Sequence, residues 1–486
     1  MSSPNTHFGA EHIGRMLEGV DAIYFIGIGG ISMSSLALMS ARLGFRVAGY
    51  DRTRTALTAS LEAEGIVVHD TVDVSHLDGF GAVVYTVAIE ETHAEYAEAM
   101  RRHLPLISRA DYLGYLMVDY ASRIGIAGSH GKSTATCMCA QILMSAGADP
   151  TVMSGAAMRS MNGSMNGSMN GSMNGSMNGA FRLGGHDSMV FEACEYKDSF
   201  LDFYPNVAVI LNAELDHVDY FRDMEQLRAS FAAFADRAGR DGMVIYNADD
   251  EETVRAMASV IPRRVTFGRV ADADYRAQNV VVERGFASFT LMHCGRSLGR
   301  IRLRVPGEHN VYNALAAAAA ARECGICSRD IVRGLEEFAG AVRRMEYKGR
   351  LNGADAYDDY AHHPTEVEAT VREAAQLGGR RLICAFQPHT YSRTAALFDR
   401  YVSALSESGA DKVIIAPIYA AREVDTRGMS ARVLAEAIGG GAIGCEDMDE
   451  VASAILAEVG PGDTVVIMGA GDIDGIWNKF SLDEDA

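Results

Sequence analysis

The sequence predicts an α/β protein built from three domains, and three observations support this fold class. The chain has 486 residues, and its length alone suggests about three domains. Short apolar segments, typical of buried strands, alternate with longer helix-like segments along the chain. Several apolar segments run directly into glycine turns or acidic residues, as strands do at the ligand-binding edge of a parallel sheet.

The first domain is predicted over residues 1–117 and is expected to be Rossmann-like. It opens with an apolar strand at 22–26, which is followed by a glycine turn and a helix-like segment that reaches Leu43. A second strand at 45–50 completes a βαβ unit.

The turn after the first strand is the predicted site of a diphosphate. Gly27 begins the turn, and Gly29 and Gly30 let a ligand approach the backbone closely. Asp51, after the next strand, falls at about the distance expected for a ribose-binding carboxylate. Ser32 stands where a dinucleotide-binding fingerprint has its third glycine or alanine, so a plain tight turn is the alternative.

The second domain is predicted over 118–340 as a central P-loop-type ATPase α/β domain. A strand at 122–127 leads into a glycine-rich turn whose backbone N–H groups and following helix would face a phosphate. Lys132 can reach the outer phosphates, and the Ser133 hydroxyl can hold Mg²⁺. The first Walker glycine is missing, because Ile126 stands in its place. The predicted nucleotide-binding loop consists of Gly128, Ser129, His130, Gly131, Lys132, Ser133 and Thr134.

Two strand ends in the second domain carry candidate metal ligands. Glu192 ends an apolar strand, and a carboxylate there would suit Mg²⁺ together with the Ser133 hydroxyl, because this ion prefers oxygen ligands. His217 follows the strand at 207–211. Such a histidine is more often an ordinary loop residue, but beside a nucleotide site it is a candidate ligand for a second metal ion. The predicted catalytic residues are Lys132, Glu192 and His217.

A tetrapeptide repeat of Met-Asn-Gly-Ser occupies residues 161–180, with alanine at its last position. Asn-Gly pairs favour turns, so we expect no regular helix or strand there. A flexible surface loop, arisen by repeat expansion or as an engineered linker, is the preferred interpretation. A metal-binding or adhesive methionine tract is the alternative.

The third domain is predicted over 341–486 and is again expected to be Rossmann-like. Apolar strands at 381–386, 412–416 and 464–468 alternate with helix-like segments. A polar segment at 357–364 holds two adjacent histidines, which rarely occur in a core, and a solvated turn is the alternative.

Composition excludes several classes of protein. The net charge of −20 argues against a nucleic-acid partner. We see no signal peptide, and the longest apolar run, at 314–321, is too short to span a bilayer. The eight scattered cysteines are typical of thiols in a reducing compartment, although Cys324 and Cys327 have ligand-like spacing. We therefore expect a cytoplasmic enzyme with no membrane or nucleic-acid partner.

Nine segments of the chain, taken in order, resemble the Mur ligase family. They cover almost the whole chain, and several motifs in one order are far more specific than any single motif. The segments are Gly27–Ser34, Gly128–Thr134, Glu192–Tyr196, Asn212–His217, His309–Asn313, Arg343–Glu346, Asp358–Pro364, Phe386–Arg393 and Ile418–Glu423.

The resemblance implies an ATP-dependent ligation with Mg²⁺. The carboxylate of UDP-N-acetylmuramate would attack the γ-phosphate of ATP, and the amine of L-alanine would then displace phosphate from the acyl phosphate. The first domain would hold the UDP-sugar, the second ATP and the third the amino acid. A monomer or weak homodimer is expected.

The resemblance also assigns roles to single residues. Ser133 and Glu192 would hold one Mg²⁺ and His217 the other; Asn310 and Asn313 would face adenine, Asp359 the ribose and Arg344 the phosphates. Tyr360, His362 and Arg393 would lie by the amino acid. The predicted UDP-sugar set is Gly27, Gly29, Gly30, Asp51 and Thr86. From the residues alone, Asn310 could equally cap a helix.

Two departures from the family pattern bear on function. Thr390 stands where the family usually has an arginine near the amino-acid carboxylate, which leaves the identity of the amino acid open. Cys194 replaces an acidic residue, so Glu192 and Glu195 must suffice. Two alternative functions follow: a recycling ligase that joins a tripeptide, and a nucleotide-regulated binding protein without turnover.

Overall fold

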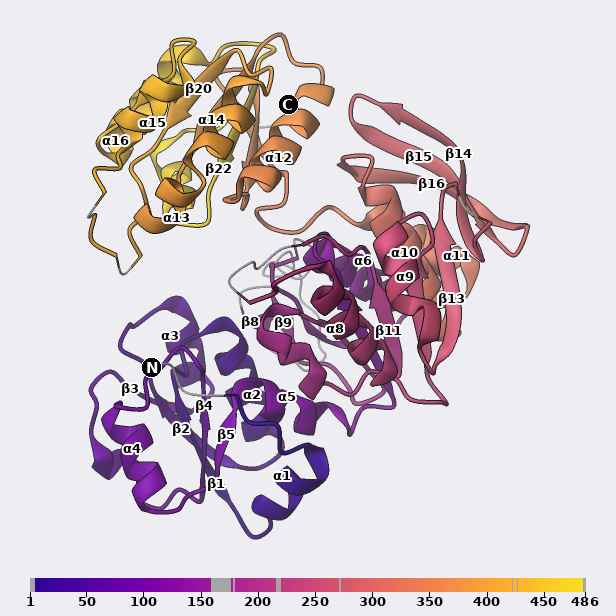
Figure 1. Cartoon of the computed structure of the whole chain (residues 1–486), viewed down its shortest axis with the longest axis vertical. Helices are drawn as coiled ribbons and strands as arrows, with labels where there is room; N and C mark the ends of the chain where they lie inside the picture. The colour runs from indigo at the N-terminus through magenta and orange to yellow at the C-terminus, as the bar shows by residue number, and fades with distance from the viewer. Residues whose placement is uncertain are drawn as a thin grey trace. The chain divides into compact units, whose positions relative to one another are not determined.

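A computed structural model of the chain describes residues 5–158, 176–177, 180–215, 220–270, 272–421, 423–425 and 427–483. Three sheets, each accompanied by helices, make up this part of the chain and confirm the predicted α/β class (Figure 1). The chain forms two compact units. The first comprises Met1–Asn279, Phe289–Ile301 and Val311–Phe338, and the second comprises Val280–Ser288, Arg302–Asn310 and Ala339–Ala486. The predicted division into domains 1–117, 118–340 and 341–486 stays a prediction.

The first sheet is entirely parallel, with the strand order β3-β2-β1-β4-β5. Its strands are β1 (Ala22–Ile26), β2 (Arg46–Tyr50), β3 (Val67–His69), β4 (Ala82–Tyr85) and β5 (Leu106–Ser108). Its helices are α1 (Ala10–Met16), α2 (Ile31–Arg42), α3 (Ala56–Ala63), α4 (Ala94–Arg101) and α5 (Arg109–Met117). Strands β1 and β2 and helix α2 match the predicted βαβ unit to within one or two residues.

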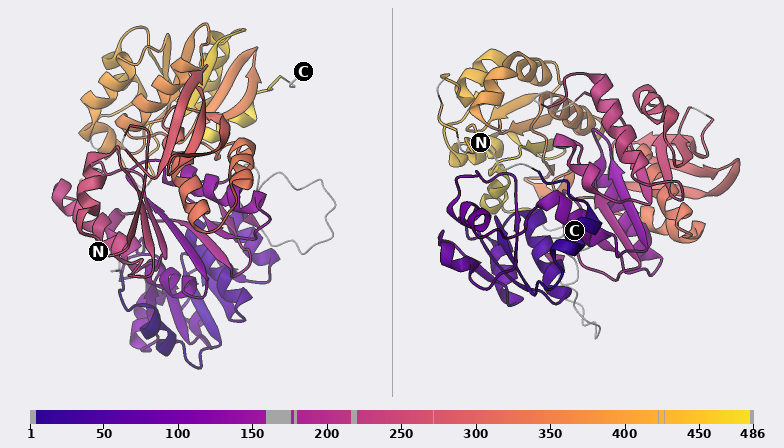
Figure 2. Two further views of the ribbon diagram at one scale, coloured as in Figure 1. Left: turned by 90° about the vertical axis from the view of Figure 1, so that its right-hand side faces the viewer. Right: turned by 60° about the horizontal axis from the view of Figure 1, so that its bottom comes forward.

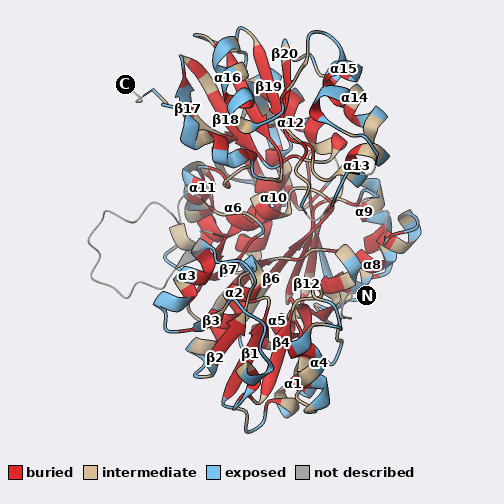
Figure 3. Cartoon of the chain, turned by 90° about the vertical axis from the view of Figure 1, so that its left-hand side faces the viewer, coloured by how far each residue is buried: buried red, intermediate tan, exposed pale blue. Residues whose placement is uncertain are grey.

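Strand β1 is buried on both faces because successive side chains point to opposite sides of the sheet (Figure 3). Ile23 and Phe25 join one apolar cluster, and Tyr24 and Ile26 join another. The strand order reverses at β1, which has β2 on one side and β4 on the other. The glycine turn that follows β1 therefore lies at a topological switch point, where ligands of open α/β sheets bind.

The second sheet has the order β16-β15-β14-β13-β12-β11-β6-β10-β7-β9-β8. Its strands are β6 (Ser122–Ala127), β7 (Thr151–Met153), β8 (Ser176–Met177), β9 (Phe181–Arg182), β10 (Ser188–Glu192), β11 (Val207–Ile210), β12 (Met243–Asn247), β13 (Arg263–Gly268), β14 (Tyr275–Glu283), β15 (Phe286–His293) and β16 (Arg296–Pro306). Its helices are α6 (Lys132–Ser145), α8 (Met224–Asp236), α9 (Glu251–Ala256), α10 (Asn310–Glu323) and α11 (Ser328–Glu337). Strand β6 pairs in parallel with β10 and β11, so the order reverses at the strand before the phosphate loop.

The expectation that the tetrapeptide repeat forms no strand is wrong at Ser176–Met177. This dipeptide forms β8, which pairs antiparallel with β9 through Ser176↔Arg182 and Met177↔Phe181. The free edge of β9 offers N–H and C=O groups to any extended backbone, so the pairing needs no strand-forming side chain. Residues 161–175 and 178–179 lie outside the described part of the chain.

The third sheet has the order β17-β18-β22-β19-β20-β21, and every pairing except β17–β18 is parallel. Its strands are β17 (Glu346–Leu351), β18 (Ala354–Asp359), β19 (Leu382–Phe386), β20 (Lys412–Ile415), β21 (Ile443–Gly444) and β22 (Thr464–Met468). Its helices are α12 (Pro364–Gln376), α13 (Tyr391–Ala396), α14 (Phe398–Ser406), α15 (Ala431–Ile438) and α16 (Met448–Glu458). Strands β19, β20 and β22 confirm the three strands predicted for this domain, and Figure 2 shows all three sheets from two further sides.

Among the described residues, no helix has both the length and the apolar run needed to cross a bilayer.

Candidate active site

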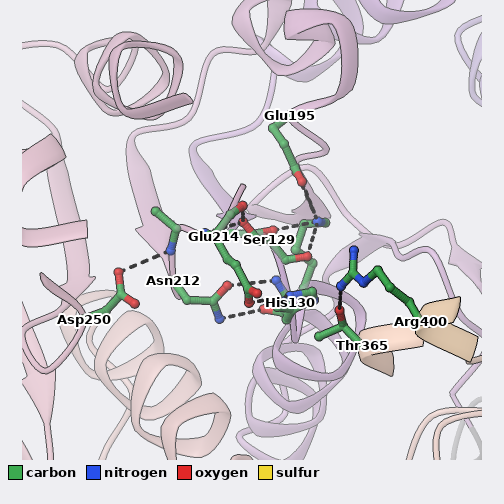
Figure 4. A network of polar contacts seen from close by, with 11 residues as sticks. Ser129, His130, Glu195, Asn212, Glu214, Asp250, Thr365 and Arg400 are labelled. Atoms are coloured by element: carbon green, nitrogen blue, oxygen red, sulfur yellow. Dashed lines mark hydrogen bonds and ion pairs between the residues drawn. The ribbon is translucent and has the colours of Figure 1, made fainter. Parts of the chain in front are cut away.

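The phosphate loop is fastened to the segment that follows β11. The backbone N–H of His130 donates to Asn212 Oδ1 (2.8 Å), and Asn212 Nδ2 donates to the His130 carbonyl (3.0 Å). The Ser129 hydroxyl donates to the carbonyl of Glu214 (2.8 Å) and accepts from its N–H (2.9 Å), as Figure 4 shows. Ser129 and His130 are thus hydrogen-bonded to the segment that follows β11. Sequence reasoning missed the anchoring role of Asn212, although it quoted the segment.

Gly131 occupies a position that only glycine can fill without strain. It caps α6 with φ of 84°, in the left-handed region, and an added Cβ would lie 2.5 Å from Asn313 Oδ1. The Asn313 amide therefore lies against the loop, at the start of a helix whose residues 314–321, seven alanines and Leu315, are all fully buried. One of the two asparagines predicted to face adenine is placed next to the phosphate site.

Gly131→Ala is expected to weaken ATP binding and to lower the free energy of unfolding by about 2–4 kcal/mol, the sum of a left-handed alanine and an overlap with Asn313. Gly147→Ala is the matched control, because Gly147 has φ of 83° just beyond α6 but nothing within 4 Å of its added Cβ. It should lose only about 1–2 kcal/mol. Chemical denaturation and nucleotide titration measure both effects, and equal losses in the two variants would contradict the steric argument.

Lys132 is held inside the loop by three acceptors. Its Nζ donates to the carbonyl oxygens of Gly128 (2.6 Å) and Ser129 (3.1 Å) and forms an ion pair with Glu195 Oε2 (3.0 Å). The side chains of Lys132 and Glu195 are 12% and 1% exposed. Burial disfavours the charge of Lys132, but the neighbouring Glu195 outweighs it, so the pKa of the lysine is raised. Lys132 is therefore charged at neutral pH and points into the loop that is predicted to hold phosphates.

Ser133 and Glu192, the two predicted metal ligands within the described residues, lie together. The Ser133 hydroxyl donates to Glu192 Oε2 at 2.8 Å, and the Gly155 N–H donates to the same oxygen at 2.7 Å. They meet because β6 and β10 are parallel neighbours whose carboxyl ends share one edge of the sheet. His217 lies outside the described residues, as do 216–219 in full.

The donor set fits Mg²⁺ bound mainly by phosphates and water. Within the described part of the chain, no three His, Cys, Asp or Glu side chains are grouped as a metal site. A hydroxyl and a carboxylate in contact at the phosphate loop are nevertheless the one or two protein oxygens that Mg²⁺ commonly uses at nucleotide sites.

A cavity of about 200 Å³ adjoins Glu192. Its walls come from the first turns of α2 and α5 and from the carboxyl ends of β7 and β10, including Ser32, Arg109, Ser154 and Cys194. Sequence reasoning missed Arg109, which opens α5 and resembles any charged residue at a helix start.

The predicted UDP-sugar residues are brought together at the end of β1. Gly29 N–H donates to Asp51 Oδ2 at 2.9 Å, and a Cβ on Gly27 would lie 2.6 Å from the methyl group of Thr86. Gly27 itself has φ of 86° and donates to the carbonyl of Tyr50. The turn, the acid and the threonine thus form one group at the switch point of the first sheet.

In the second unit, Asp359 ends β18 and is buried. Its carboxylate accepts from the N–H groups of Met345 (2.7 Å) and Ala361 (2.8 Å) and from the Thr370 hydroxyl (3.2 Å). Burial raises the pKa of this carboxyl, and the neighbouring Arg344 opposes that effect. Asp359 thereby fixes the segment that carries Arg344 and Tyr360.

The predicted amino-acid residues lie beside a histidine that the sequence reasoning did not select. The rings of Tyr360 and His362 are 5.6 Å apart, and His389 lies 5.8 Å beyond His362. Burial, His362 and Arg393 together lower the pKa of His389. Arg343 and Arg344 each lie over the Tyr360 ring. His389 lies in the segment Phe386–Arg393, which carries part of the family resemblance, and that position could have identified it.

The other asparagine, Asn310, is the first residue of α10, and its Nδ2 donates to the Pro306 carbonyl at 2.6 Å. This contact holds the start of the helix. It leaves the predicted adenine contact neither supported nor contradicted.

The fold and site define a nucleotide-binding α/β enzyme with a phosphate loop at the switch point of its central sheet. The chain belongs to the Mur ligase family. Three family profiles match it: "Mur ligase family, catalytic domain" at residues 22–121, "Mur ligase middle domain" at 126–321 and "Mur ligase, glutamate ligase domain" at 343–471.

Two curated relatives carry the same name. The chain is 40% identical to the UDP-N-acetylmuramate–L-alanine ligase of Lachnospira eligens, over 93% of this chain and 96% of that one. It is 39% identical to the ligase of the same name from Caldanaerobacter subterraneus, over 96% and 98%. Among solved structures, a UDP-N-acetylmuramate–alanine ligase from Thermotoga maritima is 26% identical with a TM-score of 0.76, over 94% and 98% of the two chains. A murein peptide ligase from Psychrobacter arcticus, 24% identical with a TM-score of 0.69, shares the fold.

Proposed function

We propose that this protein is an ATP-dependent ligase that joins L-alanine to the carboxylate of UDP-N-acetylmuramate during the synthesis of peptidoglycan precursors. The observation that carries the proposal is the grouping of Lys132, Ser133 and Glu192 at one sheet edge, in a chain that matches ligases of this name over nearly its full length. The activity is an acid–amino-acid ligation.

The reaction moves negative charge twice. A carboxylate oxygen attacks the γ-phosphorus, the bond to the β-phosphate oxygen breaks, and ADP leaves. The amine nitrogen then attacks the acyl carbon, phosphate departs and the amine loses a proton. Every reacting oxygen is anionic, so positive charge and N–H donors must be in place before the step.

Residues of this chain supply those charges. Lys132 is charged and fixed at the loop, and the N-terminus of α6 adds its backbone donors. Mg²⁺, when bound, would supply further positive charge to the phosphates. Ser133 and Glu192 would hold one ion and His217 a second.

The remaining contacts are proposed from their positions. Asn310 and Asn313 would face adenine, and Arg344 the phosphates. A carboxylate has about four acceptor positions, so Asp359, with three donors, keeps one for the ribose. Tyr360, His362 and Arg393 would surround the amino acid. Gly27, Gly29, Gly30, Asp51 and Thr86 would hold the UDP-sugar.

We also propose the domain division at 1–117, 118–340 and 341–486, for the UDP-sugar, ATP and the amino acid respectively. Three family profiles in the same order support this division, because one ends at residue 121 and the next begins at 126, and the third begins at 343. The substrates ATP and a UDP-sugar are metabolites of the cytoplasm, which supports a cytoplasmic enzyme with small-molecule partners.

Phosphate release tests the proposal. UDP-N-acetylmuramate, ATP, Mg²⁺ and L-alanine together should release phosphate, and omission of any one substrate should abolish release. Release only with L-alanyl-D-glutamyl-diaminopimelate in place of alanine would establish the recycling ligase instead. Nucleotide binding without release in either mixture would leave a binding protein. Assays with glycine or serine in place of L-alanine test how strictly an enzyme with Thr390 at this position selects its amino acid.

A further inference from the structure

Two adjacent arginines in the turn before β17 have different surroundings. The Arg343 guanidinium donates to the Gly469 carbonyl. It also forms ion pairs with Asp358 Oδ2 (3.6 Å) and Asp474 Oδ2 (3.5 Å). The Arg344 guanidinium, in contrast, forms no hydrogen bond or ion pair with any residue in the described part of the chain. Arg343 thus bonds within its own unit, whereas the donors of Arg344 are available to a ligand.

The backbone of this turn is strained, and carboxylates on both sides hold it. Arg343 and Met345 have φ of 57° and 43°, in the left-handed region that residues with side chains rarely adopt. The Arg343 N–H donates to Glu346 Oε2 (2.9 Å), and the Met345 N–H donates to Asp359 Oδ2 (2.7 Å). Such a conformation persists only where several contacts fix it, and Arg344 stands at its centre.

Asp358 is a buried partner of Arg343. Its side chain is 2% exposed, against 49% for Asp474, and its Oδ1 has no hydrogen-bond partner among the described residues. A buried carboxylate with an unused acceptor costs free energy, and a buried ion pair is weak evidence for stability. The contribution of Asp358 is therefore sought in what it does to Arg343.

The charge of Asp358 changes near neutral pH. Burial raises the pKa of its carboxyl to about 7, although Arg343 and Lys348 oppose that effect. Asp358 is therefore ionised and attracts Arg343 above pH 7, and this attraction fades below it. The other charged groups that face the pair, from β17, β18 and the 3₁₀-helix η4 (Ile473–Lys479), are Glu346, Lys348, Asp359 and Asp474.

Resting on the proposed function, in which Arg344 faces the phosphates of ATP, we propose that Asp358 and Arg343 are positioning residues for Arg344. Their ion pair fixes the side chain that begins the turn, and Asp359 fixes the backbone at its end. The Arg344 guanidinium is then in place before ATP binds. A donor that is already in place loses less conformational freedom on binding, so it contributes more to affinity.

The pH dependence of the KM for ATP tests the role of Asp358. Asp358→Asn keeps the size of the side chain and removes its charge, so at pH 8 the KM should rise about 10-fold while kcat changes less than about 3-fold. At pH 6 the carboxyl of the unmodified enzyme is itself protonated, and the two enzymes should differ less than about 2-fold. The ratio of the two enzymes cancels the titration of ATP, so a ratio that is the same at both pH values would overturn the proposal.

Asp355→Asn is the matched control. Asp355 lies on the same strand and pairs with Arg350 at 3.1 Å, but its side chain is 47% exposed. This variant should leave the KM for ATP unchanged at both pH values, because exposed pairs contribute little. A rise as large as that of Asp358→Asn would assign the effect to the strand and overturn the proposal.

A double-mutant cycle shows whether Asp358 acts through Arg344. In the Arg344→Met background, Asp358→Asn should change the KM for ATP less than about 2-fold, because the group that it positions is gone. A further rise of about 10-fold would show that Asp358 acts independently of Arg344 and would overturn the proposal.

Thermal unfolding separates positioning from a structural role. The pKa of Asp358 is raised above its ordinary value of 3.8, so its ionisation lowers stability as the pH rises from about 4 to about 7. Asp358→Asn lacks this loss and at pH 8 should melt at or above the temperature of the unmodified enzyme. A marked drop in melting temperature would reveal a structural role and overturn the proposal. If the unmodified enzyme releases no phosphate in any mixture, the proposed function itself fails, which is a distinct result.

Discussion

Lys132→Met is expected to reduce phosphate release about 1,000-fold or more, because a single positive charge aimed at a transferring phosphoryl group contributes on that scale. Its Nζ is held at the loop by two backbone carbonyls. Steady-state release at saturating substrates measures the effect. Lys479→Met, which removes an exposed lysine paired with Asp449, is the control and should retain full activity.

The same variant is expected to be less stable than the unmodified enzyme. Glu195 is almost fully buried, and removal of Lys132 takes away the cation that is paired with it, which costs about 3–5 kcal/mol. The double variant Lys132→Met, Glu195→Gln removes both charges and should recover most of the stability without recovering turnover. If the double variant released phosphate within tenfold of the unmodified enzyme, the role of Lys132 would be refuted.

Glu192→Gln is expected to have the second largest effect. The change keeps the size of the side chain but removes the charge and one acceptor for Ser133 and Gly155. Turnover should fall about 100-fold or more, and the Mg²⁺ concentration for half-maximal activity should rise about 10- to 100-fold. A Mg²⁺ titration of phosphate release measures both quantities.

Glu214→Gln is the matched control for Glu192. Glu214 also lies at the phosphate loop, but its side chain is 62% exposed and pairs with His130 at the surface. Exposed pairs contribute at most about 1 kcal/mol, so activity should change less than about fivefold. If both variants showed the same Mg²⁺ dependence as the unmodified enzyme, Glu192 would not be a metal ligand.

The parts of the site that the sequence predicts are those that follow from parallel pairing. Once β6 and β10 are expected to be neighbours, Ser133 and Glu192 must meet, because the carboxyl ends of parallel strands share one edge. The glycine turn with Asp51 is predictable in the same way, since both follow adjacent strands of one βαβ unit.

The parts that the sequence does not predict depend on tertiary packing. Nothing local distinguishes Arg109 from an exposed arginine at a helix start; its surroundings come from α2, β7 and β10. The resemblance predicted that Asp359 binds the ribose. It did not predict that the same carboxylate accepts three hydrogen bonds from Met345, Ala361 and Thr370. The repeat that contains β8 has a composition that favours turns, so its sequence does not predict a strand. The strand forms because β9 has a free edge with which it can pair.

The pairing of β8 with β9 does not depend on how many tetrapeptide units precede it. Ser176 and Met177 are the junction of two tetrapeptide units, and every earlier junction has the same two residues. Gain or loss of whole four-residue units therefore leaves the same Ser-Met dipeptide at this distance before Phe181 and Arg182, with which it pairs. Replication slippage could therefore lengthen or shorten this segment in steps while the edge of the catalytic sheet is preserved.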